Sequence, residues 1–154
     1  MVRFKTLWNN HVGSRGYVCD RITFKNQCAM RMGEALENSG ISLKKFSLKR
    51  CSDCSAKFKS HIPGHIRSAQ ELANVFYRRP SLLGAGVKKF IFSGNVNDNI
   101  GFFKNKKGMI FIMNGWDTTD HIDLWDGASM KLKGSSNTNA YRKRGKQVWF
   151  WDVT

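Results

Sequence analysis

The chain has 154 residues, of which 41% are hydrophobic and 12% aromatic, enough to bury the core of one domain. No stretch approaches the roughly 18 consecutive apolar residues of a membrane-spanning helix, and the first residues lack the apolar core of a secretory signal. The formal net charge is +15, from 26 Lys and Arg against 11 Asp and Glu. Such a surface attracts polyanions, whether nucleic acid, an anionic cell wall or a membrane surface.

Two helices are predicted in the first 40 residues. Apolar residues at positions 4, 7 and 8 indicate a short helix near the N-terminus. Cys28, Met32 and Leu36 fall on one apolar stripe, which predicts a second helix beginning at Cys28. Asn26 is placed to cap this helix, and the polar turn at 38–40 to end it.

A third helix follows an irregular segment. Residues 41–66 are rich in lysine and show no regular period, so we expect a loop insertion within a single domain of residues 1–154. Ser68 and Glu71 then have the spacing of a capping box. The helix that they begin is expected to end near Pro80.

The second half of the chain changes to the period of β-strands. Short apolar or alternating runs predict strands at 89–92, 109–113, 121–125, 128–133 and 147–151. The last run is apolar on both faces, as in a central strand or one covered on both faces. Asp126-Gly127 is typical of a two-residue hairpin turn, which would pair His121 with Leu132. Helices followed by an antiparallel sheet define an α+β fold, with the N-terminal helices packed on the sheet.

Two residues have the chemistry of a thiol nucleophile and its base. Cys28 opens a helix, and the N–H groups and dipole at a helix N-terminus favour a thiolate. His121 opens a strand after a polar loop, and histidine is the most frequent general base in enzymes. Taken alone, each residue also fits a structural role, as a small buried core cysteine and as a hydrogen-bonded histidine at a sheet edge.

Four segments, in the same order, resemble the fourth amidase effector family of the type VI secretion system. Residues 26–36 are similar to the nucleophile helix of that family, and residues 64–73 to its next helix. Residues 107–111 with 121–127 resemble the part that carries its catalytic histidine, and the closing 148–151 is also similar. These segments span nearly the whole chain.

The resemblance implies a papain-like fold of the NlpC/P60 type and a secreted antibacterial cysteine amidase that needs neither cofactor nor metal. Such an enzyme is a DL-endopeptidase, which cuts peptidoglycan stem peptides between γ-D-glutamate and meso-diaminopimelate through a thioester. Carried over residue by residue, Cys28 is the nucleophile and His121 the general base. The backbone N–H of Cys28 or the side-chain amide of Gln27 is expected to stabilise the oxyanion.

The resemblance also implies partners and a place of action. The protein is expected to be made in the bacterial cytoplasm without a signal peptide, exported by the type VI secretion machinery, and active in the periplasm of a target cell. A cognate immunity protein would inhibit it in the producer. Neither nucleic acid nor membrane insertion is expected, and the charge of +15 would then attract the protein to the anionic cell wall.

The residue that should orient His121 is less clearly indicated. Members of the family can carry an aspartate on the strand that returns beside the histidine, but the predicted hairpin places Leu132 there. Asp123 lies two residues along the same strand, on the same face as His121, and we choose it as the third catalytic residue. Asn137, or a serine of the 134–136 segment, is the alternative by a looser path.

A competing site is indicated by Cys51, Cys54, His61 and His65, which are residue types that bind zinc. In a basic chain they suggest a small zinc-stapled nucleic-acid-binding module. The gap between Cys54 and His61 is about half that of a usual zinc finger, so we prefer a surface loop with a Cys51–Cys54 disulfide. Cys19 has no assigned role.

A further interpretation keeps Cys28 and His121 but gives them a protein substrate. The same pair could then act as a deamidase or an acyltransferase, because the thioester chemistry is shared. The order of the four family-like segments favours the cell-wall amidase over both alternatives.

Overall fold

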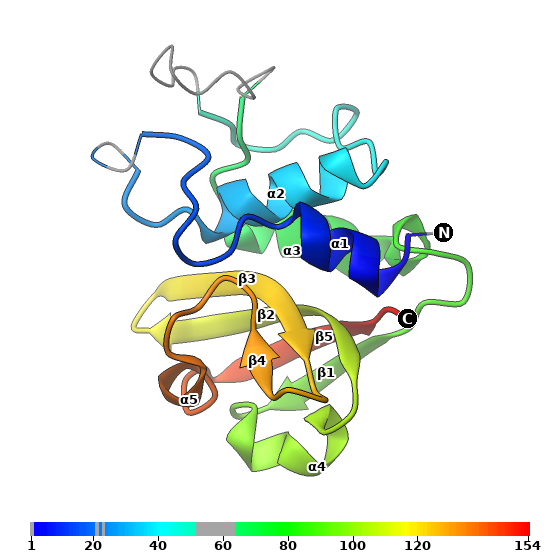
Figure 1. Cartoon of the computed structure of the whole chain (residues 1–154), viewed down its shortest axis with the longest axis vertical. Helices are drawn as coiled ribbons and strands as arrows, with labels where there is room; N and C mark the ends of the chain where they lie inside the picture. Colours follow the sequence, from blue (N-terminus) through cyan, green and yellow to red (C-terminus); the bar gives the residue numbers. More distant parts are fainter. Residues whose placement is uncertain (1, 21, 23, 52–63) are drawn as a thin grey trace.

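A computed structural model describes residues 2–20, 22, 24–51 and 64–154. Three helices, α1 (Phe4–Asn10), α2 (Cys28–Asn38) and α3 (Ala69–Arg78), lie over one face of a sheet (Figure 1). The shorter helical segments are η1 (Pro80–Leu82), η2 (Asn97–Asn99), α4 (Ile100–Phe103) and α5 (Thr138–Tyr141). Of the helices described, none is long and apolar enough to cross a membrane.

The sheet has five antiparallel strands in the order β1-β5-β2-β3-β4. They are β1 (Lys89–Ser93), β2 (Lys107–Trp116), β3 (Thr119–Asp126), β4 (Lys131–Leu132) and β5 (Gln147–Asp152). The predicted order, helices first and antiparallel sheet later, is confirmed. The last strand is central, as predicted, because β5 lies between β1 and β2.

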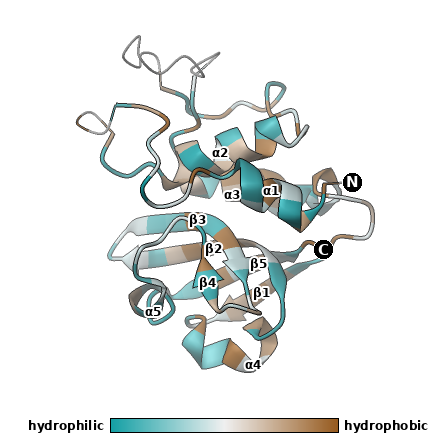
Figure 2. Cartoon of the chain, in the orientation of Figure 1, coloured by the Kyte–Doolittle hydropathy of each residue, from teal (hydrophilic) through white to brown (hydrophobic). Residues whose placement is uncertain are grey.

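Alternating side chains of the sheet feed two apolar clusters. Met109 and Phe111 of β2 pack in the cluster beneath the three N-terminal helices, whereas Ile110 and Ile112 join the cluster on the opposite face. All four are fully buried. Figure 2 shows polar and apolar residues alternating along the helices that cover the sheet. Burial on both faces explains why these strands carry long apolar runs.

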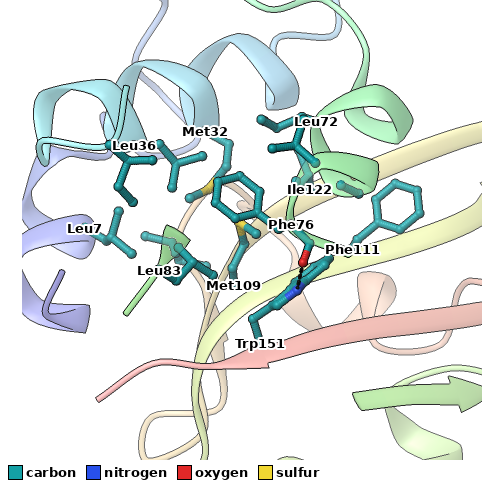
Figure 3. Close-up of a cluster of buried hydrophobic side chains, with 14 of the residues drawn as sticks. Leu7, Met32, Leu36, Leu72, Phe76, Leu83, Met109, Phe111, Ile122 and Trp151 are labelled. Atoms are coloured by element: carbon teal, nitrogen blue, oxygen red, sulfur yellow. Dashed lines mark hydrogen bonds between the residues drawn. The ribbon is translucent and has the colours of Figure 1, made fainter. Parts of the chain in front are cut away.

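The helices are held to the sheet by side chains that meet in the first cluster (Figure 3). Met32 and Leu36 come from α2, and Phe76 comes from α3. The Trp151 indole Nε1–H donates a hydrogen bond to the carbonyl oxygen of Phe76 at 3.0 Å. This contact satisfies the polar end of a buried tryptophan and fixes α3 against β5.

The helix starts follow the predicted chemistry. The Ser68 hydroxyl accepts a hydrogen bond from the backbone N–H of Glu71 at 3.1 Å, so the predicted cap of α3 is confirmed. At α2 the capping position is Gln27, one residue after the predicted Asn26. The Asn26 side chain nevertheless accepts from the backbone N–H of Cys28 at 3.3 Å. Both starts lie where the sequence placed them.

The predicted two-residue hairpin at Asp126-Gly127 is wrong. Trp125 pairs with Leu132, so His121 does not, and a longer connection joins β3 to β4. The Asp126 carboxylate widens the turn, because it accepts from the Ala128 N–H at 3.0 Å and from the Ser129 hydroxyl at 3.0 Å.

Gly127 has a packing role in place of the expected turn role. A Cβ atom at Gly127 would collide with the Phe103 carbonyl oxygen and would lie 2.7 Å from the backbone nitrogen of Asn105. Its N–H donates to the Lys106 carbonyl oxygen at 2.7 Å. The glycine is therefore needed where two backbones approach closely, a use that the dipeptide alone does not reveal.

The described ends of the 41–66 segment are part of the core. They contain no helix or strand, in agreement with the irregular segment predicted. Ile41, Leu43 and Ile66 are nevertheless buried in the cluster under the helices. Residues Arg50 and Ile66 form an antiparallel bridge that joins the two ends of the segment.

Replacing Phe76 with alanine should lower the free energy of unfolding by about 3–5 kcal/mol, because a fully buried aromatic ring would leave a cavity. Urea denaturation measures the change. The control is Val12→Ala, whose side chain is 45% exposed and whose loss should change stability by less than about 0.5 kcal/mol. Equal effects of the two substitutions would contradict this account of the core.

Candidate active site

A cavity of about 400 Å³ lies where the N-terminus of α2 meets the start of β3. Cys28 and His121, predicted as nucleophile and base, both line it. The other lining residues are mostly polar, charged or aromatic: Lys25, Asn26, Gln27, Arg31, Trp116, Thr119, Asp120, Gly134 and Tyr141. The fold therefore brings the two predicted residues to one solvent-accessible site.

Cys28 is the first residue of α2, and its side chain is mostly buried. It lines the same cavity as His121, and its thiol acts to raise the pKa of that histidine. The sulfur also lies 3.9 Å from the carbonyl oxygen of Asp120, the residue before that histidine. Met32, one turn along the same helix, packs in the core and holds this end of α2 over the sheet.

His121 is oriented by Asp123. The Nε2 atom of His121 lies 2.8 Å from Oδ2 of Asp123. Because Nε2 is engaged there, Nδ1 is the ring nitrogen that remains for the Cys28 thiol. The structure thus brings the predicted His121 and Asp123 together at the cavity that Cys28 also lines.

The Asp123 carboxylate is completely buried and surrounded by hydrogen-bond donors. Its Oδ1 accepts from the backbone N–H of Leu124 at 2.7 Å and from that of Gly134 at 2.7 Å. Gly134 belongs to the chain that returns from β4, and a Cβ atom there would lie 3.1 Å from both carboxylate oxygens. Two backbone donors and one imidazole stabilise a negative charge that would otherwise be costly to bury.

Electrostatics in the site favour a charged histidine. Burial alone would lower the pKa of His121, but the hydrogen bonds to Asp123 and Cys28 and their charges raise it to about 10. Burial acts to raise the pKa of Asp123, yet the hydrogen bond and positive charge of His121 hold it below its usual value. These effects favour the charged form of His121 beside the Asp123 carboxylate.

His11 is a buried residue of the site that sequence reasoning missed. Its Nε2 lies 3.8 Å from Oδ1 of Asp123, beyond hydrogen-bond distance, and has no other partner among the described residues. Its Nδ1 accepts from the Gly13 N–H at 3.0 Å, so the neutral ring carries its proton on Nε2, toward the carboxylate. Burial lowers the pKa of His11 to about 4. Its place beside the site depends on α1 packing, which leaves no local sequence signal.

Two aromatic side chains enclose the His121 ring. The Tyr141 ring lies edge to face with it at 4.8 Å between centroids, and the Trp116 ring at 5.9 Å. Burial raises the pKa of Tyr141, and the nearby charges of Cys28 and Asp123 act in the same direction. Sequence reasoning missed this wall, because Tyr141 lies in a four-residue helix with too little length to show a period.

Gln27 and Asn137 are engaged away from the reacting groups. The Gln27 amide nitrogen donates to the carbonyl oxygens of Cys19 at 2.8 Å and Phe24 at 3.1 Å. Its oxygen accepts from the backbone N–H of Val18 at 3.0 Å, so the side chain organises the loop before Cys28. The Asn137 oxygen caps α5 by accepting from the Ala140 N–H at 3.2 Å. Asp123, not Asn137, is the partner of His121.

The residues of the competing zinc motif are only partly described. Cys54 and His61 lie outside the described residues. The predicted Cys51–Cys54 disulfide is not formed, because Cys51 keeps its thiol, whereas Cys19 is disulfide-bonded. His65 is buried and lies 3.0 Å from Oε2 of Glu34 through its Nε2. Cys51 and His65 lie outside the lining of the cavity that holds Cys28.

The chain is similar over its whole length to solved structures. A chain of the Salmonella typhimurium Tae4/Tai4 effector–immunity system, in its selenomethionine variant, has 18% identity and a TM-score of 0.68, over 100% of this chain and 99% of that one. Enterobacter cloacae Tae4 has 18% identity and a TM-score of 0.66, over 100% and 98%. The E. cloacae Tae4–Tai4 complex has 22% identity and a TM-score of 0.64, over 100% and 99%. These likenesses establish a shared fold.

The sequence itself is also informative. None of the curated proteins compared with it matches. Residues 24–151, which include the whole of α2 and all of the sheet except the last residue of β5, match the family described as type VI secretion system amidase effector protein 4, Tae4. Because this match covers well over half of the chain, the protein belongs to the Tae4 family of type VI secretion amidase effectors.

Proposed function

We propose that this amidase is a cysteine endopeptidase of the papain-like NlpC/P60 type, with residues 1–154 as one catalytic domain. The observation that carries the proposal is that Cys28 and His121 line one cavity, with the His121 ring hydrogen-bonded to the buried Asp123 carboxylate. A thiol, an imidazole and an orienting carboxylate are the parts that covalent acyl transfer requires.

The reaction proceeds in two steps. The Cys28 thiolate attacks the carbonyl carbon of the amide, and the oxygen becomes negatively charged. His121, as the imidazolium, gives a proton to the leaving amine as the carbon–nitrogen bond breaks, and a thioester remains. His121 then takes a proton from water, which attacks the thioester and releases a carboxylic acid and the thiolate.

The developing oxyanion needs hydrogen-bond donors near the start of α2. The backbone N–H of Cys28 is the nearest candidate, and its contact with Asn26 Oδ1 is long, at 3.3 Å. A small rotation of the Asn26 side chain frees it. The Gln27 amide, also expected to help, supports this site indirectly by holding the preceding loop through the carbonyl oxygens of Cys19 and Phe24.

We propose the peptidoglycan stem peptide as substrate, cut between γ-D-glutamate and meso-diaminopimelate. A γ-linked glutamate keeps a carboxylate near the amide that is cut. Arg31 lines the cavity beside Cys28, with its guanidinium held by the carbonyl oxygens of Gly16 at 2.7 Å and Ser14 at 3.2 Å. A guanidinium fixed in this way is suited to bind a carboxylate.

The place of action and the partners follow from the same proposal. The protein would be made in the producer's cytoplasm, exported by the type VI secretion machinery and active in the periplasm of the target cell. A Tai4-like immunity protein would inhibit it, since solved relatives are Tae4–Tai4 complexes. The net charge of +15 favours an anionic cell wall as the surface that it meets.

Replacing Cys28 with alanine should abolish release of new amino groups from purified muropeptides, because no thioester can form. Mass spectrometry of the products identifies the bond that is cut. The melting temperature of the variant should stay near that of the parent, and Ile91→Ala, an exposed change on β1, should keep full activity. Full hydrolysis by Cys28→Ala would exclude this mechanism.

Replacing Asp123 with asparagine should lower kcat by about 100-fold or more, because the amide cannot stabilise the imidazolium. The alkaline limb of the pH–rate profile should also move to lower pH, since Asp123 helps to raise the pKa of His121. Asp126→Asn, on the same strand but in the turn, is the matched control and should keep its profile. An unchanged profile in Asp123→Asn would contradict the assigned role.

His11 makes the fold sensitive to acid. Its pKa is about 4 in the folded protein against 6.5 in the reference state, so the unfolded chain binds more protons between these values. Its contribution to stability is complete above pH 6.5 and falls by about 3 kcal/mol as the pH drops to 4. His11→Phe should flatten this part of the stability curve, measured by urea denaturation. A slope equal to that of the parent would show that His11 does not titrate in this window.

A further inference from the structure

A second cluster of reactive side chains lies apart from the catalytic cavity. Cys19, Cys51 and His65 are buried, with exposed fractions of 0%, 2% and 5%. The sulfur atoms of Cys19 and Cys51 and one ring nitrogen of His65 all lie within 4.8 Å of one another. Two sulfurs bound to one tetrahedral zinc, each at about 2.3 Å, are separated by about 3.8 Å. The three donors therefore need to close by only about 1 Å to share a zinc ion.

His65 is held in the orientation that a metal ligand needs. Its Nδ1 lies 3.9 Å from the Cys51 sulfur, and its Nε2 lies 3.0 Å from Oε2 of Glu34 on α2. A carboxylate that receives the outer N–H of a histidine fixes the ring and increases the basicity of the inner nitrogen. Glu34 thus occupies the position of the supporting carboxylate found behind zinc-bound histidines.

The backbone around Cys51 is already arranged for a thiolate. The N–H of His65 donates to the Cys51 sulfur at 3.1 Å, and the N–H of Cys51 donates to the His65 carbonyl oxygen at 2.9 Å. N–H groups directed at a sulfur stabilise its charged form in metal sites. The neighbouring bridge between Arg50 and Ile66 keeps the two segments together.

We propose that the reduced protein binds one Zn²⁺ through Cys19, Cys51 and His65, with Glu34 orienting His65. Thiolate and imidazole donors together favour zinc over magnesium or calcium. The site is independent of the catalytic thiol, because neither Cys28 nor His121 belongs to the cluster.

Metal binding and the disulfide of Cys19 exclude each other. Reduction by a dithiol gives two electrons and two protons to the two sulfurs of that disulfide, and the dithiol becomes a disulfide in turn. Zinc then replaces the thiol protons of Cys19 and Cys51, which pass to solvent. On the proposed function, the metal form belongs to the reducing cytoplasm of the producer and the disulfide form to the periplasm.

Either form would hold the loop that precedes the nucleophile. The carbonyl oxygen of Cys19 accepts from the Gln27 amide at 2.8 Å, and its N–H donates to the Gln27 oxygen at 3.4 Å. A metal at Cys19 would therefore join the loop before Cys28 to α2 through Glu34, and to the chain around His65. Zinc binding would therefore stabilise the loop that leads into α2, the helix that begins at Cys28.

The test is zinc binding by the whole chain after reduction with a phosphine and removal of the reductant without oxygen. Competition with a chromophoric chelator should give one Zn²⁺ per chain for the reduced parent and for Cys28→Ala, and none for the oxidised protein. Cys51→Ala and His65→Ala should weaken binding by more than about 100-fold. Substitution with Co²⁺ should give a thiolate-to-metal absorption band that Cys51→Ala lacks.

Glu34→Gln keeps all three zinc ligands. Its effect on zinc affinity therefore reports how Glu34 orients His65, and not the loss of a ligand. It should retain the stoichiometry of one but bind about 10–100-fold more weakly. Circular dichroism without zinc checks that each variant keeps the parent fold. No zinc bound by the reduced parent, or equal affinity in parent and Cys51→Ala, would overturn the site. Hydrolytic activity is not the readout, so this result and the proposed function can fail separately.

Discussion

The buried Asp123 carboxylate is the interaction on which the rest of the site depends. A charge without solvent is tolerable only when donors surround it. Here the donors are the N–H groups of Leu124 and Gly134 and the imidazole of His121. Gly134 reaches the carboxylate only after the chain has turned back through β4. The Asp123 carboxylate therefore depends both on His121 and on the chain that returns from β4. For this reason the site is stable only when the sheet is complete.

The second requirement is the position of α2. Cys28 lies at the same cavity as His121 because Met32 and Leu36 anchor its helix in the cluster that Phe76 and the sheet complete. Cys28 is the first residue of this helix, where the helix dipole favours negative charge on the thiol. Core packing and the proposed nucleophile thus share one helix, so that a change in the core would displace the sulfur.

Much of this arrangement could be predicted from the sequence, because its signals are local. The stripe that contains Cys28 and the Ser68 capping box predicted α2 and α3, and the apolar run at 147–151 predicted a central strand. Asp123, chosen from the strand period as the third catalytic residue, does lie beside His121, and its catalytic role stays a prediction. The hairpin register was wrong because Asp126-Gly127 serves side-chain and close-packing contacts. His11 and Tyr141 were missed because only tertiary packing brings them to the site.

The central claim is that Asp123 and Cys28 keep His121 positively charged at neutral pH. Nitrogen NMR of the imidazole rings in the intact protein tests it most directly, because each protonation state has its own shift. The account predicts that both ring nitrogens of His121 carry protons at pH 7 and that the ring titrates near pH 10, while His11 is neutral. A neutral His121 at pH 7, titrating near its reference pKa of 6.5, would contradict the account.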